Sequence, residues 1–286
     1  IRTTPEATEL QALLEQMLEV DCQSVVMEVS SHALEQQRVH GTKLDCAIFT
    51  NLSQDHLDYH GDMDSYYNAK TKIIDLLDKE SPSCIVVNSD DAYGKRLAEE
   101  QDLNVNVITY GITSEADVRA KEVSMSMDGV MFKLYSPWGN CMIKTPLYGR
   151  FNVSNTLAAI AAAGIRGVSL QNIRNALLAP QIPPGRLERI PGGNGYVFVD
   201  YAHTDQALEH VLLTLRELHH GPLTVVFGCG GDRDPAKRSL MAEAVARYAD
   251  RAIITNDNPR TEDPMQIVQH IIEGFDDGFN VDVILD

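Results

Sequence analysis

Short apolar runs alternate with helical patterns through the first half of the chain. Residues 24–27, 46–49, 84–87 and 105–110 are apolar and rich in β-branched or Cys residues, which predicts four short strands. Between them, apolar positions at helical spacing predict helices over 5–19, 63–77 and 92–100. Strands that alternate with helices are typical of a mostly parallel α/β sheet.

Residues 118–147 show a different pattern, in which apolar and polar positions alternate with period two. Asp128-Gly129 and Trp138-Gly139 interrupt this alternation, and the first pair lies where a tight hairpin turn is expected. We therefore expect an antiparallel insert here. A helix over 151–163 should follow, opened by an Asn and Ser cluster that can cap it.

A second α/β pattern begins after a Pro-rich break. Residues 179–185 hold three prolines and a glycine, which indicates a stiff linker. Beyond it, strands are predicted over 196–200, 223–227 and 251–255, and helices over 205–218, 236–248 and 264–274. We therefore expect two domains, residues 1–181 and residues 182–286.

Composition narrows the classes of partner. The chain has 286 residues, with 24 Lys and Arg against 41 Asp and Glu, giving a formal net charge of −17. Such a charge argues against nucleic acid or an anionic membrane surface as the main partner, so a phosphate ligand must be held by local groups or a metal. The longest apolar stretch, 157–165, is too short to span a bilayer. The five cysteines lie far apart without a CxxC pair, which favours inert thiols in a reducing cytosol.

The first candidate site combines Glu28, His56 and Lys70. Glu28 ends a predicted strand, and the loop after the next strand holds Asp55, His56, Asp58 and His60. Carboxylates and imidazoles that meet at strand ends suit a divalent cation such as Mg²⁺ or Mn²⁺. Alternatively, the acidic loop residues only cap the following helix and face water.

The second candidate site is the glycine-rich loop 228–234, between a predicted strand and a predicted helix. Its backbone N–H groups can cradle an anion, and Arg233, Lys237 and Arg238 add positive charge. The loop lacks the GxGxxG spacing of dinucleotide-binding proteins. A glycine-rich turn beside a solvated basic face is the alternative interpretation.

Two further polar groups follow predicted strands. Asp257, Asn258 and Arg260 should lie beside the glycine-rich loop, where an Arg and an Asp can hold the carboxylate and ammonium of a zwitterion. An Asn-Pro turn would explain the same residues. Asp200 and His203 also follow a strand, although His203 alone could be a cap or a packed imidazole.

Taken in order, these stretches resemble the Mur ligase family. The stretches that carry the resemblance are Met27-Glu28-Val29-Ser30-Ser31-His32, residues 51–60, Gly149-Arg150-Phe151-Asn152-Val153-Ser154-Asn155, Gly185-Arg186-Leu187-Glu188, Asp200-Tyr201-Ala202-His203-Thr204, residues 228–234 and Asp257-Asn258-Pro259-Arg260. They span nearly the whole chain. Within the family, they most resemble the enzymes that add the third residue of the peptidoglycan stem peptide.

The resemblance implies ATP-dependent amide synthesis in the cytoplasm, in the production of peptidoglycan precursors for the cell wall. ATP would phosphorylate the D-glutamyl carboxylate of UDP-N-acetylmuramoyl-L-alanyl-D-glutamate, and the amine of meso-diaminopimelate would attack the acyl phosphate. Two Mg²⁺ ions are expected, because charge on the transferring phosphoryl group must be neutralised. Arg260 marks meso-diaminopimelate rather than lysine, because it can hold the second carboxylate.

The resemblance also implies residue roles. Glu28, His56 and a carbamylated Lys70 would be metal ligands, and Lys70, Arg186 and His203 would act at the reacting groups. Three larger sets follow: Thr3, Thr4, Ser30, Gln36 and Arg38 for the UDP-linked substrate; Asn152, Asn155, Arg186, Asp200 and His203 for ATP; Arg233, Asp257, Asn258 and Arg260 for the amino acid.

Two family motifs are missing from the 286 residues, one of which is the GKGHE-like stretch that completes the amino-acid pocket. The sequence contains no GxxxxGK[ST] phosphate loop. We therefore expect an ATPase core without its P-loop strand, followed by an incomplete Rossmann-like C-terminal α/β domain, both cut from a longer protein. We also expect that these residues alone do not turn over ATP.

Three alternatives stay open on the sequence. A lysine-adding or other Mur ligase would share most motifs, and a folylpolyglutamate-synthetase-like ligase would share the ATPase core. A non-catalytic scaffold that kept the fold and lost the P-loop is the alternative from outside the enzymes.

Overall fold

The computed structural model of the protein describes residues 3–100, 105–193 and 195–285. The chain divides into two compact units. The first comprises residues 1–123, 132–143 and 151–176, and the second comprises residues 124–131, 144–150 and 177–286. No helix among the described residues is long and apolar enough to cross a membrane.

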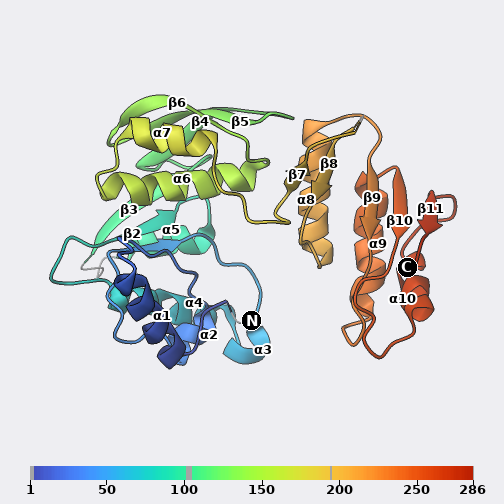
Figure 1. Cartoon of the computed structure of the whole chain (residues 1–286), viewed down its shortest axis with the longest axis horizontal. Helices are drawn as coiled ribbons and strands as arrows, with labels where there is room; N and C mark the ends of the chain where they lie inside the picture. Colours follow the sequence, from blue (N-terminus) through green and yellow to red (C-terminus); the bar gives the residue numbers. More distant parts are fainter. Residues whose placement is uncertain (1–2, 101–104, 194, 286) are drawn as a thin grey trace. The chain divides into compact units, whose positions relative to one another are not determined.

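A six-stranded sheet with the strand order β1-β2-β3-β4-β5-β6 organises the first unit (Figure 1). Its strands are β1 (Cys46–Phe49), β2 (Cys84–Asn88), β3 (Asn106–Gly111), β4 (Val118–Ser126), β5 (Gly129–Ser136) and β6 (Gly139–Thr145). The first four run parallel. Every residue of β2 is buried, as expected of a strand covered on both faces.

The predicted antiparallel insert is present. β4 ends at Ser126 and β5 begins at Gly129, and β5 and β6 are likewise separated by two residues, so neighbouring strands reverse direction. Gly129 and Gly139 have φ values of 113° and 122°, which favour glycine. The tip of the β4–β5 hairpin, residues 124–131, belongs to the second compact unit, whereas the tip of the β5–β6 hairpin lies in the first.

Helices pack on this sheet through an apolar core. They are α1 (Ala7–Glu19), α2 (Ser31–Glu35), α3 (Leu57–His60), α4 (Met63–Thr71), the 3₁₀-helix η1 (Lys72–Leu76), α5 (Ala92–Glu99), α6 (Arg150–Ile165) and α7 (Leu170–Leu178). Phe49 and Ile85 of the strands share one core cluster with Tyr67 and Leu97 of α4 and α5. Asp91 begins α5 by accepting hydrogen bonds from the N–H groups of residues 93 and 94.

The second unit repeats the α/β arrangement on a smaller scale. A parallel sheet of order β11-β10-β9 is accompanied by a two-stranded antiparallel ribbon, β7 with β8. The elements are β7 (Glu188–Ile190), β8 (Val197–Val199), α8 (Asp205–Leu218), β9 (Thr224–Phe227), α9 (Ala236–Tyr248), β10 (Arg251–Ile254), α10 (Pro264–Ile272) and β11 (Val281–Val283). Leu212, Phe227, Val245, Ile254 and Ile271 form its core with their neighbours.

The mostly parallel α/β fold class is confirmed, but one predicted strand is wrong. Residues 24–27 have no strand structure, and the side chain of Val26 is 96% exposed. An apolar run becomes a strand only where a neighbour accepts its backbone hydrogen bonds, and none of the described strands pairs with this segment. The helix predicted over 63–77 is α-helical only to Thr71 and continues as η1.

Candidate active site

A hydrogen-bonded network near the start of the chain joins four of the five residues predicted for the UDP-linked substrate. Thr4, only 1% exposed, donates from Oγ1 to the backbone oxygen of Glu28 and accepts from the N–H of Ser30, both at 3.0 Å. Arg38 donates to the backbone oxygen of Thr4 at 3.3 Å and to the side chain of Gln36. Thr3 is exposed. The network holds the segment before α2 in place.

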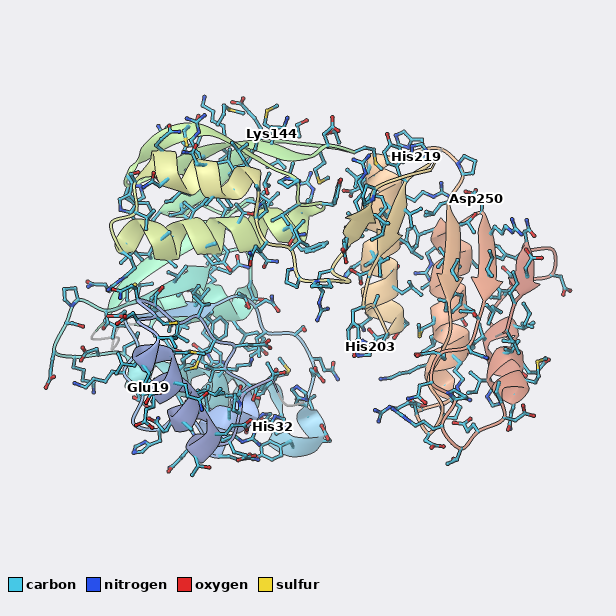
Figure 2. All side chains as sticks on the ribbon, viewed as in Figure 1. Glu19, His32, Lys144, His203, His219 and Asp250 are labelled. Carbon is cyan, nitrogen blue, oxygen red and sulfur yellow. The ribbon has the colours of Figure 1, made fainter. Side chains whose placement is uncertain are left out.

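Ser30 also caps the N-terminus of α2. Its hydroxyl accepts a hydrogen bond from the N–H of Ala33 at 3.2 Å and so begins α2. His32 belongs to α2 and is labelled in Figure 2. Ser30 therefore connects the Thr4 network to the helix that carries His32.

Three histidines gather with two tyrosines beside α2. The His32 ring lies 4.9 Å from that of His56, 5.4 Å from that of His60 and 4.1 Å from that of Tyr59, between ring centroids. His60 stacks on Tyr66 at 4.8 Å. Burial lowers the pKa of His60, and the neighbouring His32 acts in the same direction. This cluster brings polar rings to the loop that precedes α4.

Lys70 of α4 lies beside this cluster. Its Nζ is 5.7 Å from the centroid of the Tyr66 ring. Burial lowers the pKa of Lys70, while the carboxylates of Glu28 and Asp55 act in the opposite direction. Two of the predicted metal ligands, Glu28 and Lys70, are therefore close enough to interact electrostatically. The third, His56, has a left-handed backbone conformation with φ of 54°. Its Nε2 lies 3.6 Å from Oδ2 of Asp55.

The donors around Lys70 suit a weakly held Mg²⁺ rather than a closed metal cage. In the part of the chain that the structure describes, no group of three or more His, Cys, Asp or Glu side chains is arranged to hold a metal by itself. Mg²⁺ often uses only one or two protein carboxylates, with water and substrate phosphates completing its shell. Glu28 and a carbamylated Lys70 would supply such oxygens.

Asn152 and Asn155, both predicted to contact ATP, lie in the first turns of α6. Asn155 donates from Nδ2 to Oδ1 of Asn152 at 3.3 Å. Side chains three residues apart lie on the same face of a helix, so both amides are presented together. The pair belongs to the first unit.

The other residues predicted for ATP belong to the second unit and surround Tyr201. The Arg186 guanidinium lies 5.3 Å from the centroid of the Tyr201 ring, and the His203 ring lies 5.2 Å from it. The Asp200 carboxylate accepts hydrogen bonds from the N–H groups of Leu187 at 2.7 Å and Ala202 at 2.8 Å. Asp200 thereby ties the Arg186 segment to the segment of His203, which precedes α8 (Figure 2).

The glycine-rich loop and the loop after β10 lie against each other, as predicted. The N–H of Gly231 donates to the backbone oxygen of Asn258 at 2.9 Å, and Arg260 donates from Nη1 to the backbone oxygen of Gly231 at 2.6 Å. A Cβ on Gly231 would lie 1.8 Å from the oxygen of Pro259, so only glycine permits this approach. Both loops follow the carboxyl ends of parallel strands, where open α/β sheets bind ligands.

The remaining two residues predicted for the amino-acid pocket border Gly230. A Cβ built on Gly230 would lie 3.9 Å from Cγ of Arg233 and 4.0 Å from Oδ2 of Asp257. Arg233 and Asp257 are both exposed. A cationic and an anionic side chain thus flank one glycine.

Arg238 does not have the role expected of it. The sequence suggested that it adds charge to an anion cradle, but its side chain is 1% exposed and both terminal nitrogens bond to Glu262, at 2.9 and 2.8 Å. A buried arginine requires such compensation. Sequence reasoning missed Glu262 and the position of Tyr201 between Arg186 and His203.

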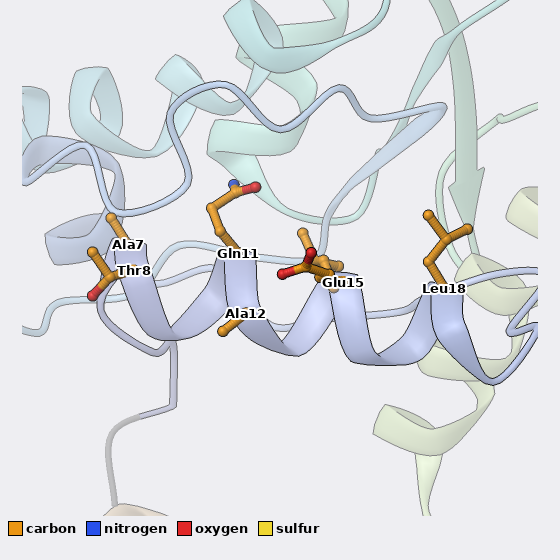
Figure 3. A pocket seen from close by; sticks show the side chains of 7 residues that line it. Ala7, Thr8, Gln11, Ala12, Glu15 and Leu18 are labelled. Atoms are coloured by element: carbon orange, nitrogen blue, oxygen red, sulfur yellow. The ribbon is translucent and has the colours of Figure 1, made fainter.

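A surface depression along α1 is unrelated to these groups. It is lined by Ala7, Thr8, Gln11, Ala12, Leu14, Glu15 and Leu18 (Figure 3). All of these belong to one face of a single helix, and none is a predicted site residue.

Comparison with known families matches both halves of the chain. The sequence profile described as the Mur ligase middle domain matches residues 1–163, and that of the Mur ligase glutamate ligase domain matches residues 185–286. The boundary expected at residues 181 and 182 stays a prediction.

Two curated relatives that match the chain have the same name. The UDP-N-acetylmuramoyl-L-alanyl-D-glutamate--2,6-diaminopimelate ligase of Geobacter sulfurreducens is 47% identical over 277 residues, which are 95% of this chain and 54% of that protein. The enzyme of the same name from Geobacillus kaustophilus is 46% identical over 280 residues, 95% of this chain and 56% of that protein. The chain thus spans about half the length of the curated relatives it matches.

A solved structure with the same name shares the fold. It superposes with a TM-score of 0.73 at 37% identity, covering 99% of this chain and 58% of that one.

Proposed function

Because the chain belongs to the Mur ligase family, we propose that it is part of a cytoplasmic enzyme that joins meso-diaminopimelate to UDP-N-acetylmuramoyl-L-alanyl-D-glutamate. The reaction forms an amide bond at the expense of ATP in peptidoglycan precursor synthesis. The relatives named for this reaction support the proposal, with identities of 46–47% over 95% of the chain.

One observation carries the choice of amino acid. The loop that contains Asp257 and Arg260 is hydrogen-bonded to the glycine-rich loop, which places a carboxylate and a guanidinium on the same rim of the β9–β10 sheet. Meso-diaminopimelate has two ammonium groups and two carboxylates. Arg260 would bind the carboxylate that lysine lacks, and Asp257 would bind an ammonium group.

The proposed ligation has two steps, formation of an acyl phosphate and its attack by an amine. An oxygen of the D-glutamyl carboxylate attacks the γ-phosphorus of ATP, which forms an acyl phosphate and releases ADP. The neutral amine of diaminopimelate then attacks the acyl carbon, a proton leaves the nitrogen, and phosphate departs with the C–O bonding electrons. Thr4, Ser30, Gln36 and Arg38, with Thr3, would hold the UDP-linked substrate.

Two groups of residues are candidates for binding the nucleotide, each within its own unit. Asn152 and Asn155 present two amides from α6, and Arg186, Asp200 and His203 surround Tyr201. Arg186 would offset negative charge on the transferring phosphoryl group, and His203 would donate a hydrogen bond to it.

Lys70 would act in its carbamylated form. Burial favours its neutral amine, the form that reacts with carbon dioxide, and the resulting anion would join Glu28 and His56 as a ligand of Mg²⁺. Bound Mg²⁺ would neutralise charge on the phosphoryl group during transfer.

The proposal is tested with the protein expressed from its complete gene. Purified protein is incubated with ATP, Mg²⁺ and UDP-N-acetylmuramoyl-L-alanyl-D-glutamate, together with either meso-diaminopimelate or lysine. Mass spectrometry of the nucleotide-linked product should show one added diaminopimelate for each ADP released, and little product with lysine.

Parallel incubations separate the alternatives. Preference for lysine would replace the amino-acid assignment, and glutamate addition to a folate would replace the substrate class. The absence of any ATP-dependent product from a folded protein would overturn the enzyme assignment and leave a binding role.

A further inference from the structure

Glu262 has more partners than a carboxylate on a loop usually has. Oε1 accepts hydrogen bonds from the backbone N–H of Asp232 at 2.5 Å and from Nη2 of Arg238 at 2.8 Å, while Oε2 accepts from Nη1 of Arg238 at 2.9 Å. The carboxylate therefore bonds to both the glycine-rich loop and α9. Both partners lower the pKa of Glu262, with Arg238 the larger influence, so it is anionic near neutral pH.

Arg238 adds further connections to the same junction. Its Nη2 reaches the backbone oxygen of Gly230 at 3.4 Å, and its Nη1 lies 2.9 Å from Nδ1 of His270 on α10. Since the Arg238 side chain is 1% exposed, it cannot exchange these partners for water without moving the loop. One ion pair, between a buried arginine and a partly exposed glutamate, thus links α9, α10 and both loops.

In the Glu262–Arg238 ion pair, Glu262 is close to Arg260 along the chain. Glu262 follows Arg260 by two residues, and its own N–H donates to the oxygen of Pro259 at 3.0 Å. Arg260 and Asp232 both have left-handed backbone conformations, with φ of 50° and 52°, which surrounding contacts must maintain. Thr261 assists by donating from Oγ1 to Oδ1 of Asp232 at 2.7 Å.

We propose that Glu262 is a positioning residue for the amino-acid pocket, which sets the place of Arg260 by fastening the N–H of Asp232 and the guanidinium of Arg238 to the Arg260 loop. This inference rests on the proposed function of Arg260 as the ligand of the second carboxylate. Both oxygens of the Glu262 carboxylate bond to Asp232 and Arg238, so its effect on the substrate passes through the two loops.

Amide hydrogen exchange tests the mechanical part of the inference without any substrate. In Glu262→Ala, the amides of Asp232 and Gly231 should exchange at least about tenfold faster, because the first loses its acceptor and the second its fixed partner loop. The amide of Ala252, which donates to the oxygen of Asn280 within the sheet, should be unchanged if the fold is intact. Glu243→Ala, an exposed position on α9, is the matched control.

Steady-state kinetics test the consequence for the pocket, with the protein expressed from its complete gene. Glu262→Gln preserves the shape of the side chain but removes its charge. We expect the KM for meso-diaminopimelate to rise about tenfold while kcat and the KM values for ATP and the UDP-linked substrate change little. Glu262→Asp, which keeps the charge on a shorter stem, should recover part of the loss, and Glu243→Gln should behave as wild type.

The outcomes separate this inference from the proposed function. If the wild-type protein ligates meso-diaminopimelate but Glu262→Gln leaves its KM unchanged, the positioning role is wrong. Equal changes in the KM of all substrates, or unchanged exchange at Asp232 in Glu262→Ala, would also overturn it. If wild type does not use diaminopimelate, the proposed function fails, while accelerated exchange at Asp232 and Gly231 would still establish the fastening of the loops.

Discussion

The guanidinium of Arg260 donates from Nη1 to the backbone oxygen of Gly231 at 2.6 Å, across the two loops that follow β9 and β10. An arginine side chain has five N–H donors, so this hydrogen bond leaves others for a ligand. Under the proposed function, the contact holds the side chain that would bind the second carboxylate of meso-diaminopimelate, which lysine lacks. It also makes Arg260 a test of substrate choice.

Arg260→Ala should lower kcat/KM for meso-diaminopimelate about a hundredfold in the protein expressed from its complete gene. The reason is the loss of a charge-assisted contact to a carboxylate, which contributes roughly 2 to 3 kcal/mol. Use of lysine should change much less, because lysine has no second carboxylate. Arg251→Ala, which removes an exposed arginine paired with Asp282, is the control. An equal loss for both amino acids would show that Arg260 acts on the fold rather than on specificity.

The alternation of apolar and helical patterns was sufficient to predict both parallel sheets. Residues 84–87 are apolar throughout because β2 is covered on both faces, and a buried strand has few other solutions. The same pattern misled at residues 24–27, where Val26 is almost fully exposed. Apolar composition records the preference of the side chains, whereas a strand also requires a hydrogen-bonded neighbour.

Motifs predicted which loops lie together better than they predicted the partners of individual side chains. Asp257, Asn258 and Arg260 do lie against the glycine-rich loop, because both segments follow neighbouring parallel strands. The pairing of Arg238 with Glu262 joins residues 24 positions apart and depends on how α9 packs. Burial of a charged side chain has no local sequence signature, so Arg238 was expected at the surface.

Thr4→Val should destabilise the first unit by about 1 to 3 kcal/mol. The substitution keeps the volume of the side chain but leaves the N–H of Ser30 and the oxygen of Glu28 without their partner in a buried place. Urea unfolding monitored by circular dichroism measures the change in the free energy of unfolding. Thr8→Val, at an exposed position of α1, should have little effect. Equal stability of the two variants would contradict the structural role of the Thr4 hydroxyl.

The side-chain amine of Lys70 should react with carbon dioxide to form a carbamate, and the Lys70→Arg variant should form none at this position. Burial lowers the pKa of Lys70, although Glu28 and Asp55 oppose the shift, so its neutral amine forms at a lower pH than that of an exposed lysine. Carbamate content should therefore rise with pH and begin to rise earlier than at any exposed lysine. A carbamate carbon resonance in ¹³C-bicarbonate should appear in wild type and in the control Lys72→Arg, but not in Lys70→Arg. A resonance of equal intensity in all three proteins would refute the assignment.

Asp90→Asn should remove a pH-dependent part of the stability of the first unit. Burial acts to raise the pKa of Asp90, but hydrogen bonds from Ile112, Thr113 and Ser114 outweigh it, and the net pKa is lowered. A carboxyl group whose pKa is lower in the folded state stabilises the fold above its unfolded pKa of about 3.9, and this contribution is lost as the pH falls through the folded pKa. Near pH 7 the variant should be less stable by about 1 kcal/mol, allowing for solvent screening of an exposed group, and the difference from wild type should shrink below about pH 3. Urea unfolding at both pH values measures this, with the exposed Asp75→Asn as control. A stability difference that is independent of pH would show that the shape of the Asp90 side chain, and not its charge, fastens the loop after β2 to the loop after β3.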